Sequence, residues 1–146
     1  VACRLCRGQR YFRWKRSADA GSVLEALSEY LGERFTSSAS IDVDSEPSSK
    51  FVRGVVLREG RTRRVISADA FRRAIGRKLG WNTVLSPSFS AERRGARIVF
   101  RGRGFGSQVG LCVAGPVIQA GTSRIYRDIL TFYFPGTAVI GGVSGE

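Results

Sequence analysis

A glycine-rich segment with alternating arginines holds the residues that are best suited to contact a ligand. The apolar run Ile98–Phe100 continues into Arg101 and Arg103, which alternate with glycines at positions 102, 104, 106 and 110. Side chains alternate between the two faces of an extended strand, so both guanidinium groups should project from the same face. The glycines leave the other face bare, and another backbone or a flat ligand can approach it closely.

Three cysteines offer thiolate chemistry. Cys3 and Cys6 form a C-x-x-C pair, which can chelate one metal from a tight turn, form a redox pair or close a disulfide. The pair supplies two of the four ligands of a tetrahedral zinc site, and Cys112 is the candidate third; the chain has no histidine to be the fourth. A structural or vestigial zinc site, a disulfide and free thiols all stay open, and a secreted location favours the disulfide.

The composition is that of a basic globular protein. The 146 residues are 42% hydrophobic and carry a net charge of +12, nearly all of it from arginine. Such a surface favours polyanions, namely nucleic acid, anionic lipid or an acidic wall polymer, although a simply solvated arginine-rich face is the plain alternative. The lack of histidine removes the commonest general base near neutral pH.

The sequence contains no stretch that is long and apolar enough to span a membrane, and no signal peptide is recognisable. It starts at Val1 and has no methionine, which indicates a fragment or a processed product.

Two β-hairpins and a helix between them are expected to position the glycine-rich segment. The runs 51–58 and 61–66 flank the turn signal Glu59-Gly60, and the runs 89–93 and 96–101 flank Arg94-Gly95. Ser67 is predicted to cap a short helix with one apolar face, made of Phe71, Ala74 and Ile75.

Two longer helices are expected outside this region. The Ser22-x-x-Glu25 capping box and the apolar spacing after it predict a helix over about 20–34, followed by a loop with a short strand at 39–43. A helix from Thr122 or Ser123 should end at Pro135-Gly136, after a short helix over 117–120; its apolar stripe is Ile125, Ile129, Phe132 and Tyr133.

The remaining elements complete the fold prediction. A last strand is predicted after Ala138. Trp81 is expected to fill the core, and a platform that stacks a sugar is the alternative role. Together the elements predict an α+β fold in which antiparallel β-hairpins carry two longer helices and one short helix, within a single domain over 1–146.

Two blocks resemble one known family. The run Phe100–Cys112, FRGRGFGSQVGLC, is similar to the signature F-x-G-x-G-W-G-H-G-V-G-[LM]-[SC] of the stage II sporulation protein D / amidase-enhancer (SpoIID/LytB) family. The run Ile125–Thr137, IYRDILTFYFPGT, resembles the second block of that family, at the matching separation and without a gap. The helix at 69–76 resembles the small helix before the strand pair.

The polar positions of the signature are the ones that differ. Ser107 stands where the family has histidine, Gln108 where it has glycine, and Val113-Ala114 where it has Gln-Trp. The structural positions are retained. This pattern indicates a degenerate or inactive relative.

The resemblance implies a role at the bacterial cell wall. Family members cleave peptidoglycan glycan strands as lytic transglycosylases or enhance a cell-wall amidase, in the cell envelope or outside the cell. Some use a cysteine pair with histidine for zinc; here that resemblance reaches only Cys3 and Cys6, because the histidine partner is missing. By the same resemblance the catalytic acid belongs to an upstream segment that this chain lacks, so no catalysis is expected from this piece alone. The residues expected to bind the glycan are Arg101, Arg103, Gly104, Ser107, Gln108 and Tyr126; Tyr126 can also be a core aromatic.

A nucleic-acid-binding module is the alternative function. The arginine groups 61–64, 72–73, 93–94 and 101–103 can form a phosphate track, and the run RGRGFG resembles an RGG box. Against it, the basic residues are scattered along the sequence and no recognised nucleic-acid motif is present. A structural remnant that binds nothing specific is the third interpretation.

Overall fold

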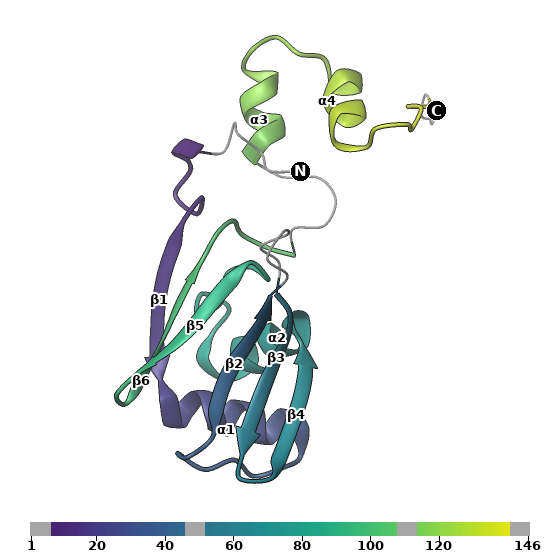
Figure 1. Cartoon of the computed structure of the whole chain (residues 1–146). Coiled ribbons are helices and arrows are strands. Elements are labelled where there is room, and N and C mark those ends of the chain that lie inside the picture. Colours follow the sequence, from purple (N-terminus) through teal and green to yellow (C-terminus); the bar gives the residue numbers. More distant parts are fainter. Residues whose placement is uncertain (1–6, 46–51, 108–113, 141–146) are drawn as a thin grey trace. The chain divides into compact units, whose positions relative to one another are not determined.

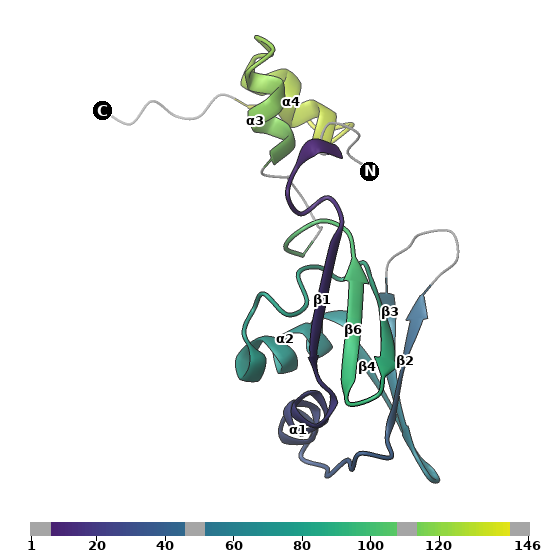
Figure 2. The ribbon, with the colours of Figure 1, turned by 90° about the vertical axis from the view of Figure 1, so that its left-hand side faces the viewer.

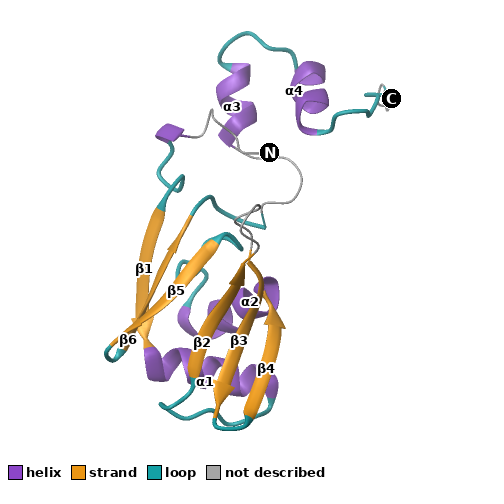
Figure 3. Ribbon diagram, viewed as in Figure 1, coloured by secondary structure: helices purple, strands orange, loops and turns teal. Residues whose placement is uncertain are grey.

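The computed structural model describes residues 7–45, 52–107 and 114–140. They belong to two compact units, Arg10–Ser107 on the one hand and Val1–Gln9 with Gln108–Glu146 on the other. The described residues form two three-stranded antiparallel sheets and four helices, which confirms the predicted α+β class (Figures 1 and 3).

The first sheet contains the glycine-rich strand at its centre. Its order is β1 (Trp14–Asp19), β6 (Arg97–Gly102) and β5 (Phe89–Arg94), with both pairings antiparallel. The predicted β5–β6 hairpin is confirmed, but its turn lies one residue later than expected: Arg94 pairs with Arg97, so the turn residues are Gly95 and Ala96. Strand β1 was not expected from its charged sequence, and it forms because all six of its residues pair with β6.

The second sheet has the order β2 (Ser40–Ser45), β3 (Val52–Glu59) and β4 (Thr62–Ser67). The predicted β3–β4 hairpin is confirmed, but the turn lies one residue later than expected. Glu59 pairs with Thr62, so the turn residues are Gly60 and Arg61, and Gly60 has the positive φ of 55° that favours glycine.

The longest helices are α1 (Ala20–Leu31) and α2 (Ala68–Leu79), with 12 residues each; α2 was expected to be the short helix, and the helix expected to be long near the C-terminus has only 8 residues. Helix α1 begins at Ala20, as expected, but it ends at Leu31 and not near residue 34, and its N-cap is Asp19 in place of Ser22. Asp19 Oδ2 accepts a hydrogen bond of 2.8 Å from the Ser22 amide. This bond holds the pKa of Asp19 below its ordinary value. Helix α2 is capped by Ser67, as predicted.

One hydrophobic core joins these helices to both sheets, and α1 and α2 lie on the same side of the strands (Figure 2). Three phenylalanine rings form its centre: Phe71 of α2 stacks on Phe89 at 5.6 Å between centroids and meets Phe100 edge-on at 6.0 Å. The expectation that Trp81 fills the core is wrong. Its side chain is 60% exposed, and its ring lies against Gly76 on the surface of α2.

Replacing Ser67 with alanine should lower the free energy of unfolding by about 1 kcal/mol, because the Ala70 amide loses its capping acceptor. Urea denaturation would measure the change. Ser67→Asp keeps a capping oxygen and should restore most of the loss. Equal stability of Ser67→Ala and the parent protein would mean that the cap contributes nothing.

The second unit contributes two short helices, α3 (Ala114–Ala120) and α4 (Tyr126–Tyr133). Helix α3 includes the predicted helix, whereas α4 begins later than expected, because Ser123 adopts a positive φ of 64°. Of the predicted apolar stripe only Ile129 is buried, and Ile125 and Phe132 are exposed. The described part of the predicted last strand, residues 138–140, is not a strand.

Candidate functional site

An open hollow of about 330 Å³ lies where several strand ends of the larger unit meet. The register places Trp14, Gly102 and Phe89 side by side, so the start of β1, the end of β6 and the start of β5 share one edge. We call this site the arginine hollow. Its lining residues are Arg13, Ser45, Ser88, Phe89, Arg101, Gly102 and Arg103.

Both motif arginines line the arginine hollow, together with an arginine that the sequence did not single out. Arg13 immediately precedes β1 and is exposed. The antiparallel pairing of β1 with β6 brings Arg13 next to Arg101 and Arg103. In the sequence, Arg13 and Lys15 flank the buried Trp14, and this alternation could have indicated a strand with a basic outer face. Three guanidinium groups around one hollow can bind an anionic group.

Glu92 of β5 holds one of these arginines. Its carboxylate accepts a hydrogen bond of 3.1 Å from Arg101 and lies 3.0 Å from Arg94. The Arg94 hydrogen bond, with a smaller contribution from Arg101, lowers the pKa of Glu92 below its ordinary value. A general acid needs a raised pKa, so Glu92 is suited to position Arg101 and not to donate a proton.

The bare glycine face is covered by the protein's own tryptophan. A Cβ atom at Gly102 would lie 2.2 Å from Cζ2 of Trp14 and 2.5 Å from the Ser88 carbonyl oxygen. The indole Nε1 also donates a 2.9 Å hydrogen bond to the carbonyl of Gly104. The expectation that this glycine face admits another backbone or a flat ligand is therefore corrected: an internal indole occupies it at Gly102.

Hydrogen bonds fix the backbone that presents Arg103. Its amide donates to the carbonyl of Ser88 at 2.9 Å, and its carbonyl accepts from the hydroxyl of the fully buried Ser86 at 2.6 Å. The next residue, Gly104, has a φ of 74° and donates to the carbonyl of Tyr11. Gly104 thus shapes the chain and carries no ligand-binding side chain.

The other predicted site residues are more dispersed. Ser107 is exposed at the end of the larger unit, after Gly106. Tyr126 lies on α4 in the other unit and is 59% exposed, which argues against a core role, and its hydroxyl accepts a hydrogen bond from Arg127. Gln108, Cys3, Cys6 and Cys112 lie outside the described residues.

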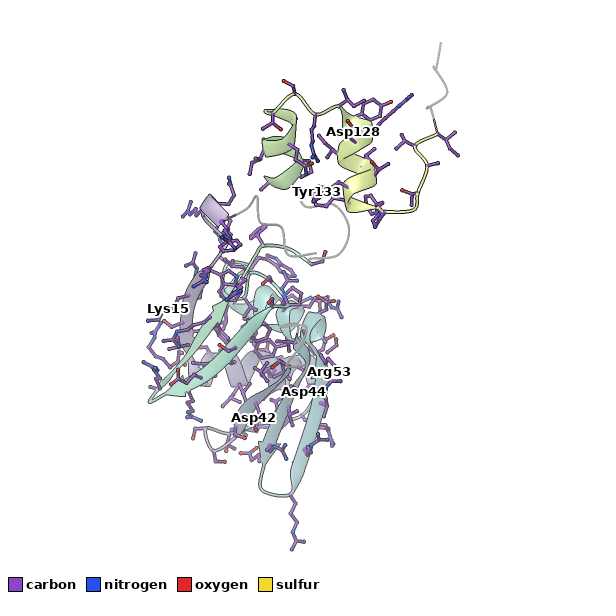
Figure 4. The ribbon with its side chains drawn as sticks, turned by 45° about the horizontal axis from the view of Figure 1, so that its top comes forward. Lys15, Asp42, Asp44, Arg53, Asp128 and Tyr133 are labelled. Carbon is purple, nitrogen blue, oxygen red and sulfur yellow. The ribbon has the colours of Figure 1, made fainter. Side chains whose placement is uncertain are left out.

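Basic side chains also gather on the outer face of the first sheet, the face opposite the buried Ile98 and Phe100. Lys15 of β1 is paired directly with Arg101, and Arg94 is paired with Arg97. Figure 4 shows Lys15 on β1. The same figure shows Asp44 and Arg53 of the second sheet, which form an ion pair with a separation of 3.8 Å. Like charges directly across a ladder are destabilising, and here Glu92 offsets only part of them.

Several arginines of the proposed phosphate track form hydrogen bonds or ion pairs with other groups of the protein. Arg64 binds Glu33, Arg72 donates to the carbonyls of Val84 and Leu85, and Arg93 donates to those of Ser37 and Ala39. The basic surface of the larger unit is thus centred on the first sheet and includes residues that the sequence did not select.

No helix in the described part of the chain is long and apolar enough to cross a membrane. Within residues 7–45, 52–107 and 114–140, no group of three or more His, Cys, Asp or Glu side chains is placed to hold a metal ion. In comparisons with known proteins, no family model and no curated protein sequence matches the chain.

Proposed function

We propose that this chain binds the glycan strands of peptidoglycan, as the binding part of a SpoIID/LytB-like lytic transglycosylase or amidase enhancer. The observation that carries the proposal is the arginine hollow. Arg101 and Arg103, the basic residues of the family-like signature, line one hollow together with Arg13. Peptidoglycan carries carboxylates on its stem peptides, and on its lactyl groups where the stem peptide has been removed; guanidinium forks bind carboxylates in a bidentate manner.

The geometry of the hollow supports binding of a preorganised kind. The Arg103 backbone is fixed by Ser86 and Ser88, and the Arg101 side chain is held by Glu92. The Ser45 hydroxyl at the same hollow can hydrogen-bond to sugar hydroxyl groups. Groups that are already in place lose less conformational entropy when the ligand binds.

The rest of the proposal follows the resemblance. The protein would act in the cell envelope or outside the cell, next to a cell-wall amidase, and Cys3, Cys6 and Cys112 would be the zinc ligands if a metal is bound.

Retention on purified peptidoglycan tests the function. The double variant Arg101→Ala/Arg103→Ala should bind about tenfold more weakly, because each lost guanidinium removes a charge-assisted hydrogen bond. The sedimentation assay is run on sacculi with and without stem peptides, at low and moderate salt. Arg61→Ala/Arg77→Ala is the matched control: both arginines are exposed, lie away from the hollow, and removing them lowers the net charge equally. If both double variants lose the same amount of peptidoglycan binding, the loss comes from the lower net charge, and this result would contradict a specific role of the hollow.

Nucleic-acid binding is the second candidate, and the cross-strand pairs Lys15–Arg101 and Arg94–Arg97 favour it. Phosphate binding weakens steeply with salt because counterions are released, whereas sugar binding that depends on shape weakens less. A salt titration against single- and double-stranded DNA therefore separates the two. Capture by DNA equal to capture by peptidoglycan, with release of both at moderate salt, would support the nucleic-acid function and contradict the glycan function.

A further inference from the structure

An exposed aromatic ring follows Arg103, a residue of the arginine hollow, two positions later in the chain. Phe105 is 61% exposed, and its ring stacks on Tyr11 with centroids 5.1 Å apart and planes inclined by 26°. Tyr11 in turn packs against the hydrophobic core. A large aromatic side chain that is held flat on an anchored ring but left open to solvent is typical of a binding surface. We call Tyr11 and Phe105 the aromatic platform.

The backbone keeps the aromatic platform in this position. On one side of Phe105, the Gly104 amide donates a 2.9 Å hydrogen bond to the carbonyl of Tyr11; on the other, the Gly106 amide donates one of 2.9 Å to the carbonyl of Leu85. Both glycines have positive φ angles, 74° and 84°, which other residues rarely adopt. The exposure of Phe105 is therefore built into the chain path and does not depend on a loose side chain.

Positive charge borders the platform. The Arg10 guanidinium lies 5.4 Å from the centre of the Tyr11 ring, in a cation–π contact. Arg103, which lines the hollow, is separated from Phe105 by Gly104 alone. A ligand on the platform is thus within reach of the hollow, and its anionic substituents would meet arginines.

We propose that the aromatic platform is a subsite that stacks one pyranose ring of the glycan strand. This inference rests on the proposed function and deepens it. A pyranose has an apolar face of C–H groups and a rim of hydroxyl groups, so it can lie on one exposed ring while its polar substituents turn to Ser45 and the arginines of the hollow. The single open ring fits one sugar residue.

A neutral sugar isolates the stacking from the charges. The probe is the β-1,4-linked tetramer of N-acetylglucosamine, which has no carboxylate. Its C–H protons should move upfield in the NMR spectrum when the parent protein is added, because they enter the ring current of Phe105. Phe105→Ala should abolish the shift and weaken binding about tenfold, in line with the loss of one aromatic stacking contact, while Phe105→Trp should retain it.

Phe132→Ala is the matched control. Phe132 is also exposed and also meets an aromatic neighbour, Tyr133, but in an edge-on arrangement that offers no flat pair. The Phe132→Ala variant should bind the tetramer with the same affinity as the parent protein. Phe105→Leu keeps apolar bulk without a ring and separates stacking from folding; circular dichroism verifies that each variant is folded.

The outcomes are distinguishable. If the parent binds peptidoglycan but Phe105→Ala and Phe105→Leu bind the tetramer as tightly as the parent, the platform proposal is overturned and the glycan function stands. If the parent is not retained on peptidoglycan, both proposals fall. If Phe105 is needed for single-stranded DNA but the tetramer does not bind, the platform stacks bases and the sugar assignment is wrong.

Discussion

Phe71→Ala is expected to lower the free energy of unfolding by about 4 kcal/mol. The Phe71 side chain is fully buried and contacts the rings of Phe89 and Phe100, so it ties α2 to both strands of the β5–β6 hairpin. Its removal leaves a cavity that the two sheet rings cannot fill without leaving their own positions. The loss is a large share of the about 5–15 kcal/mol that stabilises a typical domain.

Urea denaturation followed by circular dichroism measures this loss. Phe71→Leu keeps most of the apolar volume and should cost less than about 1.5 kcal/mol. Val65→Ala, at an exposed position of β4, should change stability by less than about 0.5 kcal/mol. A loss at Phe71→Ala no larger than at Val65→Ala would show that the three-ring centre does not hold the helix on the sheet.

Gly102→Ala is expected to lower the free energy of unfolding by about 3 kcal/mol. The new Cβ atom would lie within 2.2–2.6 Å of the Trp14 indole and 2.5 Å from the Ser88 carbonyl oxygen. Neither neighbour moves easily: the indole is buried and hydrogen-bonded to Gly104, and Ser88 O already accepts the Arg103 amide. The same shift would displace Arg101 and Arg103 at the edge of the hollow, so binding to peptidoglycan should weaken even in the folded variant.

A double-mutant cycle tests the cause. Trp14→Phe removes the Cζ2 and Cε2 atoms of the indole, so the double variant should be less destabilised than the sum of the single variants. Gly8→Ala is the matched control, because a Cβ atom there meets nothing within 4 Å. Strict additivity of the two single changes would mean that the indole is not what excludes a side chain at 102.

Local signals predicted the hairpins and the helix between them. Gly60 and Gly95 mark the two turns, and Ser67 with Phe71 marks the start and the buried face of α2; these depend on a few neighbouring residues. The N-cap of α1 was assigned to the wrong residue because two nearby side chains can both cap the helix. Asp19 caps α1 in place of Ser22 because a carboxylate three residues before an amide can bond to it equally well.

Contacts between residues that are distant in the sequence could not be predicted from such local signals. Strand β1 is rich in charge, and its extended form comes from pairing with β6, about 80 residues later. The same pairing brings Arg13 to the hollow and Tyr11 under Phe105. Trp81 was expected inside on hydrophobicity alone, but Phe71, Phe89 and Phe100 already fill the core next to α2.

Short-range patterns were enough for the class of fold, because turn residues, helix caps and strand alternation depend on neighbouring residues; composition gave the strongly basic character, and strand alternation selected Arg101 and Arg103 as candidate binding residues. The tertiary structure decided which groups share a site. It set Arg13 beside the motif arginines, tied Arg101 to Glu92, filled the bare glycine face with Trp14 and left Phe105 open on Tyr11. The Arg101–Glu92 bond lies within the β5–β6 hairpin, but the other three arrangements depend on the antiparallel register between β1 and the distant β6, where a shift of one residue would turn every side chain to the other face.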